Sequence, residues 1–178
     1  MSNQDLIDFS KEHIFYEIQM FHFTWKSLTH SKPAPGLGYN AMVESFALHA
    51  RVLFDFFYPN PRKKLKDDDI VGYHYFESEE KYKEYFSVRP LDIEFIFSEV
   101  SKMAAHLTTF RIEYKRENKN WDLNLIKQKI VSSIELFFSK ASPEKIGDIS
   151  FFKNLDWNEG HCITVSCVTS SSIIIKSS

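Results

Sequence analysis

The chain of 178 residues is 43% hydrophobic, contains 17 phenylalanines and carries a formal net charge of −2. This composition excludes an intrinsically disordered chain, and the balance of 22 basic and 24 acidic residues lacks the strong positive charge of a general nucleic-acid binder. The length fits one domain that can bury a continuous core without disulfides. The first residues show no signal-peptide pattern and no apolar run reaches the length of a membrane span, so we expect a cytoplasmic protein without membrane contacts.

The chain has two cysteines, Cys162 and Cys167, which lie near its C-terminal end beside His161. A disulfide framework needs more cysteines, and a structural zinc site takes four ligands with closely paired cysteines. We therefore expect free thiols in a short terminal strand, with no metal ion and no cofactor.

Two helices are predicted in the first third of the chain. Residues 4–29 place apolar and aromatic side chains at spacings of three and four, which is typical of an amphipathic helix. Two prolines and two glycines within residues 33–38 interrupt this pattern. A second and more apolar helix is predicted over residues 39–58, ending before Pro59 and Pro61.

Residues 62–90 have no sustained periodicity and are predicted to form a long connection with one short helix near 77–86. Asp67, Asp68 and Asp69 are adjacent in this connection, so their side chains diverge. Because carboxylates that share a metal ion must converge on it, we interpret this run as a solvated charge run.

Two further helices are predicted after the connection, over residues 91–116 and 122–141, the second ending before Pro143. From residue 147 onward, loop residues mix with β-branched runs, which favours a small hairpin, an edge strand or a poorly ordered end.

Four amphipathic helices with almost no alternating strand pattern predict an all-α fold. We expect a four- to five-helix bundle over residues 1–142, followed over residues 143–178 by a short irregular or β-prone C-terminal tail.

Ionisable residues embedded in the second predicted helix are candidates for a special role, because burying an unpaired charge is costly. At about 100° per residue, Glu44, Arg51 and Asp55 fall within roughly 40° of one another, whereas His49 points about 140° away from Glu44. We expect the first three to form a structural stripe of alternating charge that lets an otherwise apolar helix lie in the bundle centre.

The third predicted helix places His106 at one margin of its apolar face and Arg111 at the other. A histidine at such a margin either completes a polar network in the core or opens onto a cleft. If the second and third helices are neighbours, His49 and His106 are candidate acid and base groups, and Arg51 and Arg111 are candidate phosphate ligands.

Four segments occur in a recognisable order: NAMVESFALHARVLFDFFY, KDDDIVGYHYF, HLTTFR and KNWDLNLI. Their succession resembles a group of uncharacterised bacterial all-helical proteins that share ESFxxHxRxLxDF, an acidic connector, HLTYxR and KxW blocks. The resemblance covers residues 17–138. More distantly, a helical bundle with His and Arg on its inner helices resembles the HEPN superfamily of toxin, defence and RNA-processing domains.

The HEPN resemblance implies RNA cleavage without a metal ion, by an Rx4–6H motif that often lies at a dimer interface. In this chain His106 precedes Arg111, which is the reverse of that order. The reversed order favours a different function: a non-enzymatic helical module that associates with itself or with a partner and whose inner polar residues are structural. The alternative is a HEPN-like ribonuclease or RNA-binding component of a bacterial defence or toxin system. An aromatic-rich bundle is also compatible with a homodimer.

Overall fold

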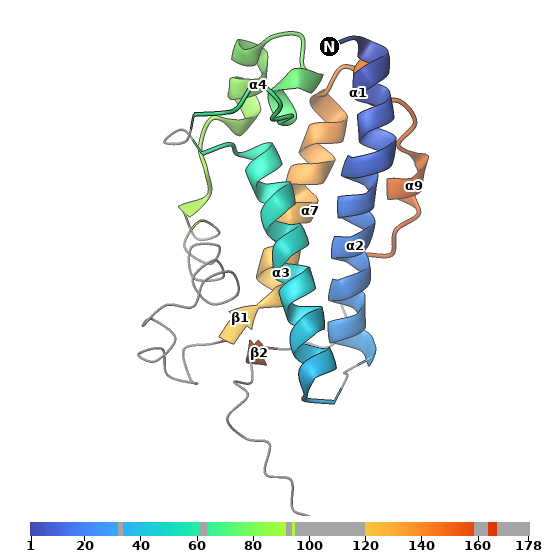
Figure 1. Ribbon diagram of the computed structural model, residues 1–178, viewed down its shortest axis with the longest axis vertical. Helices are drawn as coiled ribbons and strands as arrows, with labels where there is room; N and C mark the ends of the chain where they lie inside the picture. Colours follow the sequence, from blue (N-terminus) through green and yellow to red (C-terminus); the bar gives the residue numbers. More distant parts are fainter. Residues whose placement is uncertain (32–33, 61–63, 92–93, 95–119, 159–163, 167–178) are drawn as a thin grey trace, which may run out of the picture.

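The computed structural model of the protein describes residues 1–31, 34–60, 64–91, 94, 120–158 and 164–166 (Figure 1). The described residues are mostly helical, and the all-α fold predicted from the sequence is confirmed. Apart from residues 91 and 94, the predicted helix over 91–116 lies outside the described residues, as does the cluster of His161, Cys162 and Cys167.

The first predicted helix is confirmed as one continuous helical rod. It consists of α1 (Asn3–Phe9), the π-helical turn Ser10–Ile14, α2 (Phe15–Lys26) and a second π-helical turn, Ser27–Ser31. Its start is fixed by a capping box, in which the Asp5 backbone N–H donates to the Ser2 hydroxyl and the Ser2 backbone N–H donates to the Asp5 carboxylate. These hydrogen bonds lower the pKa of Asp5.

The second and fourth predicted helices are also confirmed, as α3 (Leu37–Phe57) and α7 (Leu123–Lys140). The side chain of Asp122 caps α7 by accepting hydrogen bonds at 3.0 Å from the backbone N–H groups of Asn124 and Leu125.

Shorter helices fill the connections between the long ones. A 3-10 turn, Gly72–Tyr75, and α4 (Glu79–Phe86) lie in the predicted long connection, where the sequence pattern also predicts a short helix. After α7 come α8 (Pro143–Ile146) and α9 (Ser150–Lys153).

The described structure includes one small antiparallel pairing, between β1 (Asn120–Asp122) and β2 (Thr164–Ser166). Trp121 is opposite Val165 in this register. The β-branched residues near the C-terminus thus provide an edge strand, one of the outcomes expected for the tail.

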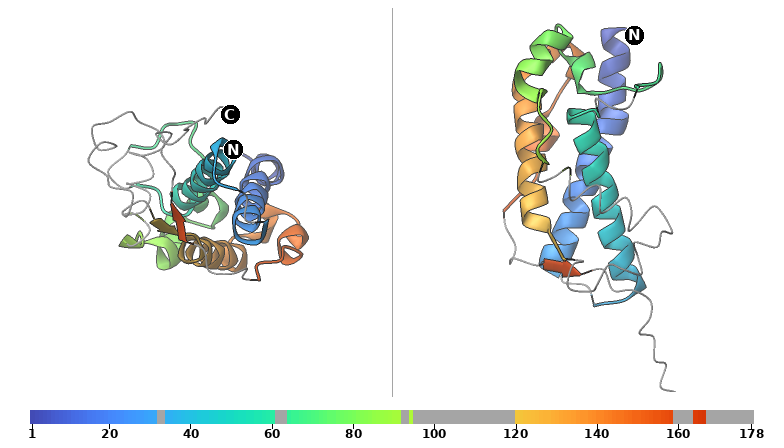
Figure 2. Two further views of the ribbon diagram at one scale, coloured as in Figure 1. Left: turned by 90° about the horizontal axis from the view of Figure 1, so that it is seen from below. Right: turned by 90° about the vertical axis from the view of Figure 1, so that its left-hand side faces the viewer.

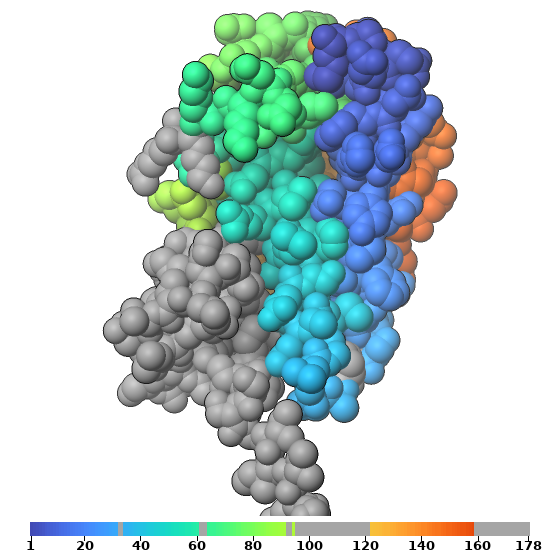
Figure 3. Space-filling model, viewed as in Figure 1, coloured from blue at the N-terminus to red at the C-terminus, as the bar shows by residue number. Residues whose placement is uncertain are grey.

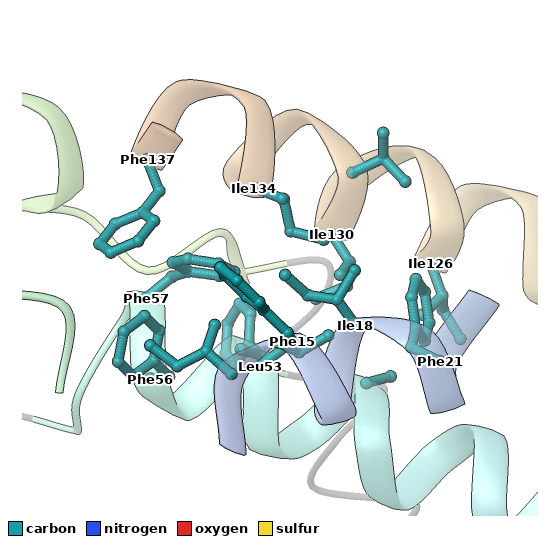
Figure 4. Packing of buried hydrophobic residues seen from close by; sticks show 14 of the residues in the cluster. Phe15, Ile18, Phe21, Leu53, Phe56, Phe57, Ile126, Ile130, Ile134 and Phe137 are labelled. Atoms are coloured by element: carbon teal, nitrogen blue, oxygen red, sulfur yellow. The ribbon is translucent and has the colours of Figure 1, made fainter. Parts of the chain in front are cut away.

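The core lies between three long helical rods, formed by α1 with α2, by α3 and by α7. Seen along their axes, the rods occupy the corners of a triangle, with α9 outside α2 and α7 (Figure 2). Apolar residues at every third or fourth position of α7 point toward α2 and α3 (Figure 4). The largest fully buried side chains are mostly aromatic and comprise Trp25, Tyr75, Phe21, Phe46, Phe54, Phe57, Phe76, Phe137, Ile18, Leu28 and Leu53.

Residues 143–158, which the sequence pattern places in the tail, pack against the bundle. Ile146 in α8 is buried beside α1, and the ring of Phe151 lies 4.1 Å from that of Phe15. The indole of Trp157 packs against α2, 6.1 Å from the ring of Trp25. This segment therefore covers α2 and contributes to the hydrophobic core.

Candidate functional site

A buried histidine and a partly exposed carboxylate join α2 to α3. The Nδ1 atom of His49 lies 2.6 Å from Oε2 of Glu17, and the two side chains are 9% and 22% exposed. The ring of Tyr16 packs edge-on against His49 at 5.9 Å. A carboxylate at Nδ1 orients the imidazole and selects the tautomer that carries a proton there. The pair thus satisfies two polar groups at a helix interface.

The predicted polar stripe of α3 lies at the surface. Glu44 is exposed, and the side chains of Arg51 and Asp55 are 34% and 44% exposed, with Arg51 Nε 3.6 Å from Asp55 Oδ2. The expectation that this stripe is buried in the bundle centre is therefore wrong. The physical reason is rotational: the buried face of α3 contains Val43 and Phe54, and Glu44 follows Val43 by about 100° around the helix.

Arg89 is a polar residue at this end of α3 that the sequence pattern does not single out. Its Nη2 atom lies 3.0 Å from Oδ1 of Asp55, and its Nη1 atom donates a hydrogen bond to the carbonyl oxygen of Tyr58. The guanidinium carbon lies 4.7 Å from the centre of the Phe54 ring. Arg89 therefore ties the segment after α4 to the C-terminal end of α3.

The structure does not assemble the predicted acid, base and phosphate ligands into one site within its described part. His49 and Arg51 are about 200° apart around α3, so they occupy different sides of that helix. His49 faces Glu17 of α2, whereas Arg51 lies beside Asp55. His106 and Arg111 lie outside the described residues.

A pocket of about 630 Å³ lies where the first helical rod, α3 and residues 59–60 and 64–71 meet. The chain segment that follows α3, coloured green in Figure 3, lies beside the upper end of α3 and next to α1. The volume is in the range of small-molecule sites, about 300–1,000 Å³. Its lining includes apolar residues from all three segments and six ionisable residues, which are His13, Glu17, Asp55, Lys64, Lys66 and Asp69.

Four large apolar side chains are exposed on α2 and α3, and we name them the α2–α3 face. They are Tyr16 (50% exposed), Phe23 (57%), Leu48 (57%) and Val52 (41%). They lie on the sides of the two helices that face away from the core, and both helices are visible side by side in Figure 3.

Comparison of the chain with protein-family models, curated proteins and solved structures finds no match. Among the described helices, none has both the length and the apolar character needed to cross a membrane. Within the described part of the chain, no three His, Cys, Asp or Glu side chains are grouped closely enough to hold a metal ion.

Proposed function

We propose that the protein is a non-catalytic helical module that forms a homodimer through its α2–α3 face. The observation that carries this proposal is the exposure of Tyr16, Phe23, Leu48 and Val52 on two adjacent helices. Isolated exposed apolar residues are ordinary, whereas contiguous ones mark interaction surfaces.

Helix geometry supports a contiguous patch. Tyr16 and Phe23 are seven residues apart and therefore lie on nearly one line along α2, and Leu48 and Val52 are one turn apart on α3. The ring of Tyr16 contacts His49, which follows Leu48 in the chain, so the two rows of exposed side chains lie on neighbouring parts of α2 and α3. None of the four members is ionised, and the charges of the exposed Glu44 and the partly exposed Arg51, one turn from Leu48 on α3, lie at the rim of the face.

A second copy of this chain fits the face because a two-fold axis pairs the same patch on both protomers. Aromatic side chains bury roughly 150–250 Å² each. The half-exposed Tyr16 and Phe23, together with the smaller Leu48 and Val52, therefore offer roughly 300 Å² per protomer. A standard interface buries about 800 Å² per partner. The proposed dimer is therefore weak and dependent on concentration.

The inner polar residues have structural roles in this proposal. The His49–Glu17 pair lies beneath Tyr16 and holds α2 against α3, which keeps the two halves of the α2–α3 face in register. Arg89 and Asp55 hold the far end of α3.

Sedimentation velocity over a concentration series from about 1 μM to about 200 μM tests the proposal, since weak complexes have dissociation constants in this range. We expect the average mass of the wild type to rise toward that of a dimer. The double variant F23E/L48E places charges on the face and should remain monomeric. The control V88E changes another exposed apolar residue, which is 74% exposed and outside the face, and should behave as the wild type. A wild type that is monomeric throughout would refute the proposal.

The second candidate function is the HEPN-like ribonuclease, and one observation favours it. A histidine whose Nδ1 is held by a carboxylate has the arrangement of many general bases, and His49 with Glu17 has this arrangement. The test is a metal-free cleavage assay on total bacterial RNA with the wild type, the variant H49A and the double variant H106A/R111A. Cleavage by the wild type that is lost in folded H49A and folded H106A/R111A would support this function, and absence of cleavage by the wild type would reject it.

A further inference from the structure

The pocket between the first helical rod, α3 and residues 64–71 has walls that favour an apolar ligand body. Its apolar lining comes from the first helical rod, from α3 and from the connection that follows α3, so the folded bundle is needed to form it. These residues are Phe9, Ile14, Val52, Leu53, Phe56, Pro59, Leu65, Ile70 and Val71. Apolar walls of this kind bind by excluding water from a matching apolar surface.

The three carboxylates that line the pocket already accept polar contacts. Glu17 accepts from His49 at 2.6 Å, and Asp55 accepts from Arg89 at 3.0 Å. Oδ2 of Asp69 accepts a hydrogen bond at 2.7 Å from a backbone N–H three residues earlier in the chain. The Arg89 guanidinium balances the charge of Asp55, whereas Glu17 and Asp69 keep their negative charge, so a preference for an anion depends on how closely its head approaches the two lysines of the pocket.

Two lysines also line the pocket. Lys64 and Lys66 flank Leu65 in the segment that lines it, and both lysines are exposed. Among the described residues, no carboxylate lies within ion-pair distance of either ammonium group. An anion at the pocket mouth would gain favourable electrostatic interactions with both lysines.

We propose that this pocket binds an amphiphile with an apolar body and a single anionic head. The apolar body occupies the space between the first helical rod and α3, and the head lies at the mouth beside Lys64 and Lys66. This site is separate in function from the α2–α3 face, although Val52 belongs to both, and the variants chosen below therefore leave Val52 unchanged.

Isothermal titration calorimetry with two probes of equal chain length tests the charge of the head. Dodecanoate carries an anion and undecyltrimethylammonium a cation on the same undecyl chain, so the apolar contribution of the chain is matched. We expect dodecanoate to bind the wild type at least about tenfold more tightly, which corresponds to about 1.4 kcal/mol. Equal binding of the two probes, tighter binding of the cation, or no binding of dodecanoate would overturn the proposal.

Two variants locate the binding site. K64Q/K66Q removes both ammonium groups and should weaken dodecanoate binding by about tenfold. The matched control K83Q/K153Q removes the same charge from exposed lysines outside the pocket and should bind as the wild type. I70W adds bulk to a half-buried wall of the pocket and should abolish binding. Circular dichroism establishes that each variant is folded, and dodecanoate binding unchanged in both K64Q/K66Q and a folded I70W would also overturn the proposal.

Discussion

The pair of His49 and Glu17 should be a measurable source of stability. Its atoms are 2.6 Å apart and its side chains are 9% and 22% exposed, so the interaction is largely shielded from water. A hydrogen bond to a charged group contributes about 1.5–3 kcal/mol, and the partial exposure of Glu17 places this pair near the lower end of that range. We expect a coupling energy of about 1.5 kcal/mol at pH 7.

A double-mutant cycle isolates this coupling from lost packing. The free energy of unfolding is measured by urea denaturation for the wild type, E17A, H49A and E17A/H49A. The sum of the stability losses in the two single variants should exceed the loss in the double variant by the coupling energy. E44A serves as the control because Glu44 is an exposed carboxylate, and it should change stability by less than about 0.5 kcal/mol. A coupling energy near zero, or an E17A effect no larger than that of E44A, would refute the interpretation of this pair as a structural link.

Three further outcomes follow from the structure. R89A should destabilise the protein by about 2 kcal/mol in urea unfolding, because it removes two hydrogen bonds and a cation–π contact from a side chain that is 14% exposed; R89K should recover only part of this loss. Burial raises the pKa of Tyr75 to about 12, whereas the unfolded tyrosine titrates near 10. The unfolded state therefore loses its proton first, so the contribution of Tyr75 to stability should be constant below about pH 10 and fall between about pH 10 and 12; in Y75F, monitored by circular dichroism, the fall of stability in this range should be smaller. W157A should cost about 2 kcal/mol in thermal or urea unfolding, since the indole packs on Trp25 and Phe21; a loss below 0.5 kcal/mol would contradict the packing of residues 143–158 on the bundle.

The long helices follow directly from local sequence signals. The prolines and glycines of residues 33–38 separate α2 from α3, and the aspartate cap at Asp122 together with Pro143 delimits α7. These signals act within a few residues, so they can be read without knowledge of the tertiary structure.

The error about the stripe has a different origin. Helix periodicity correctly groups Glu44, Arg51 and Asp55 on one side of α3, but it does not determine which side of a very apolar helix faces the core. The buried side contains Val43 and Phe54, while Leu48 and Val52 remain exposed. Because α3 also has apolar residues on its exposed side, its sequence predicts burial for a polar stripe that lies at the surface.

The partners of the candidate residues were not predictable from local patterns. Glu17 is 32 residues from His49 in sequence, and Arg89 is 34 residues from Asp55. Such pairs depend on how helices pack against one another, which amphipathic periodicity leaves undetermined. Arg89 also lies beside Pro90 in a connection without periodicity, so no helical pattern identifies it.

Association of two copies of the chain through the α2–α3 face can be detected directly with a fluorine label on that face. A trifluoromethyl group is attached to L48C in one sample and to V88C in another, both in a C162S/C167S background. We predict that the fluorine signal at position 48 shifts or broadens as the protein concentration rises, while the signal at position 88 does not change. A constant signal at position 48 while the sedimenting mass doubles would place the dimer interface elsewhere and contradict the account.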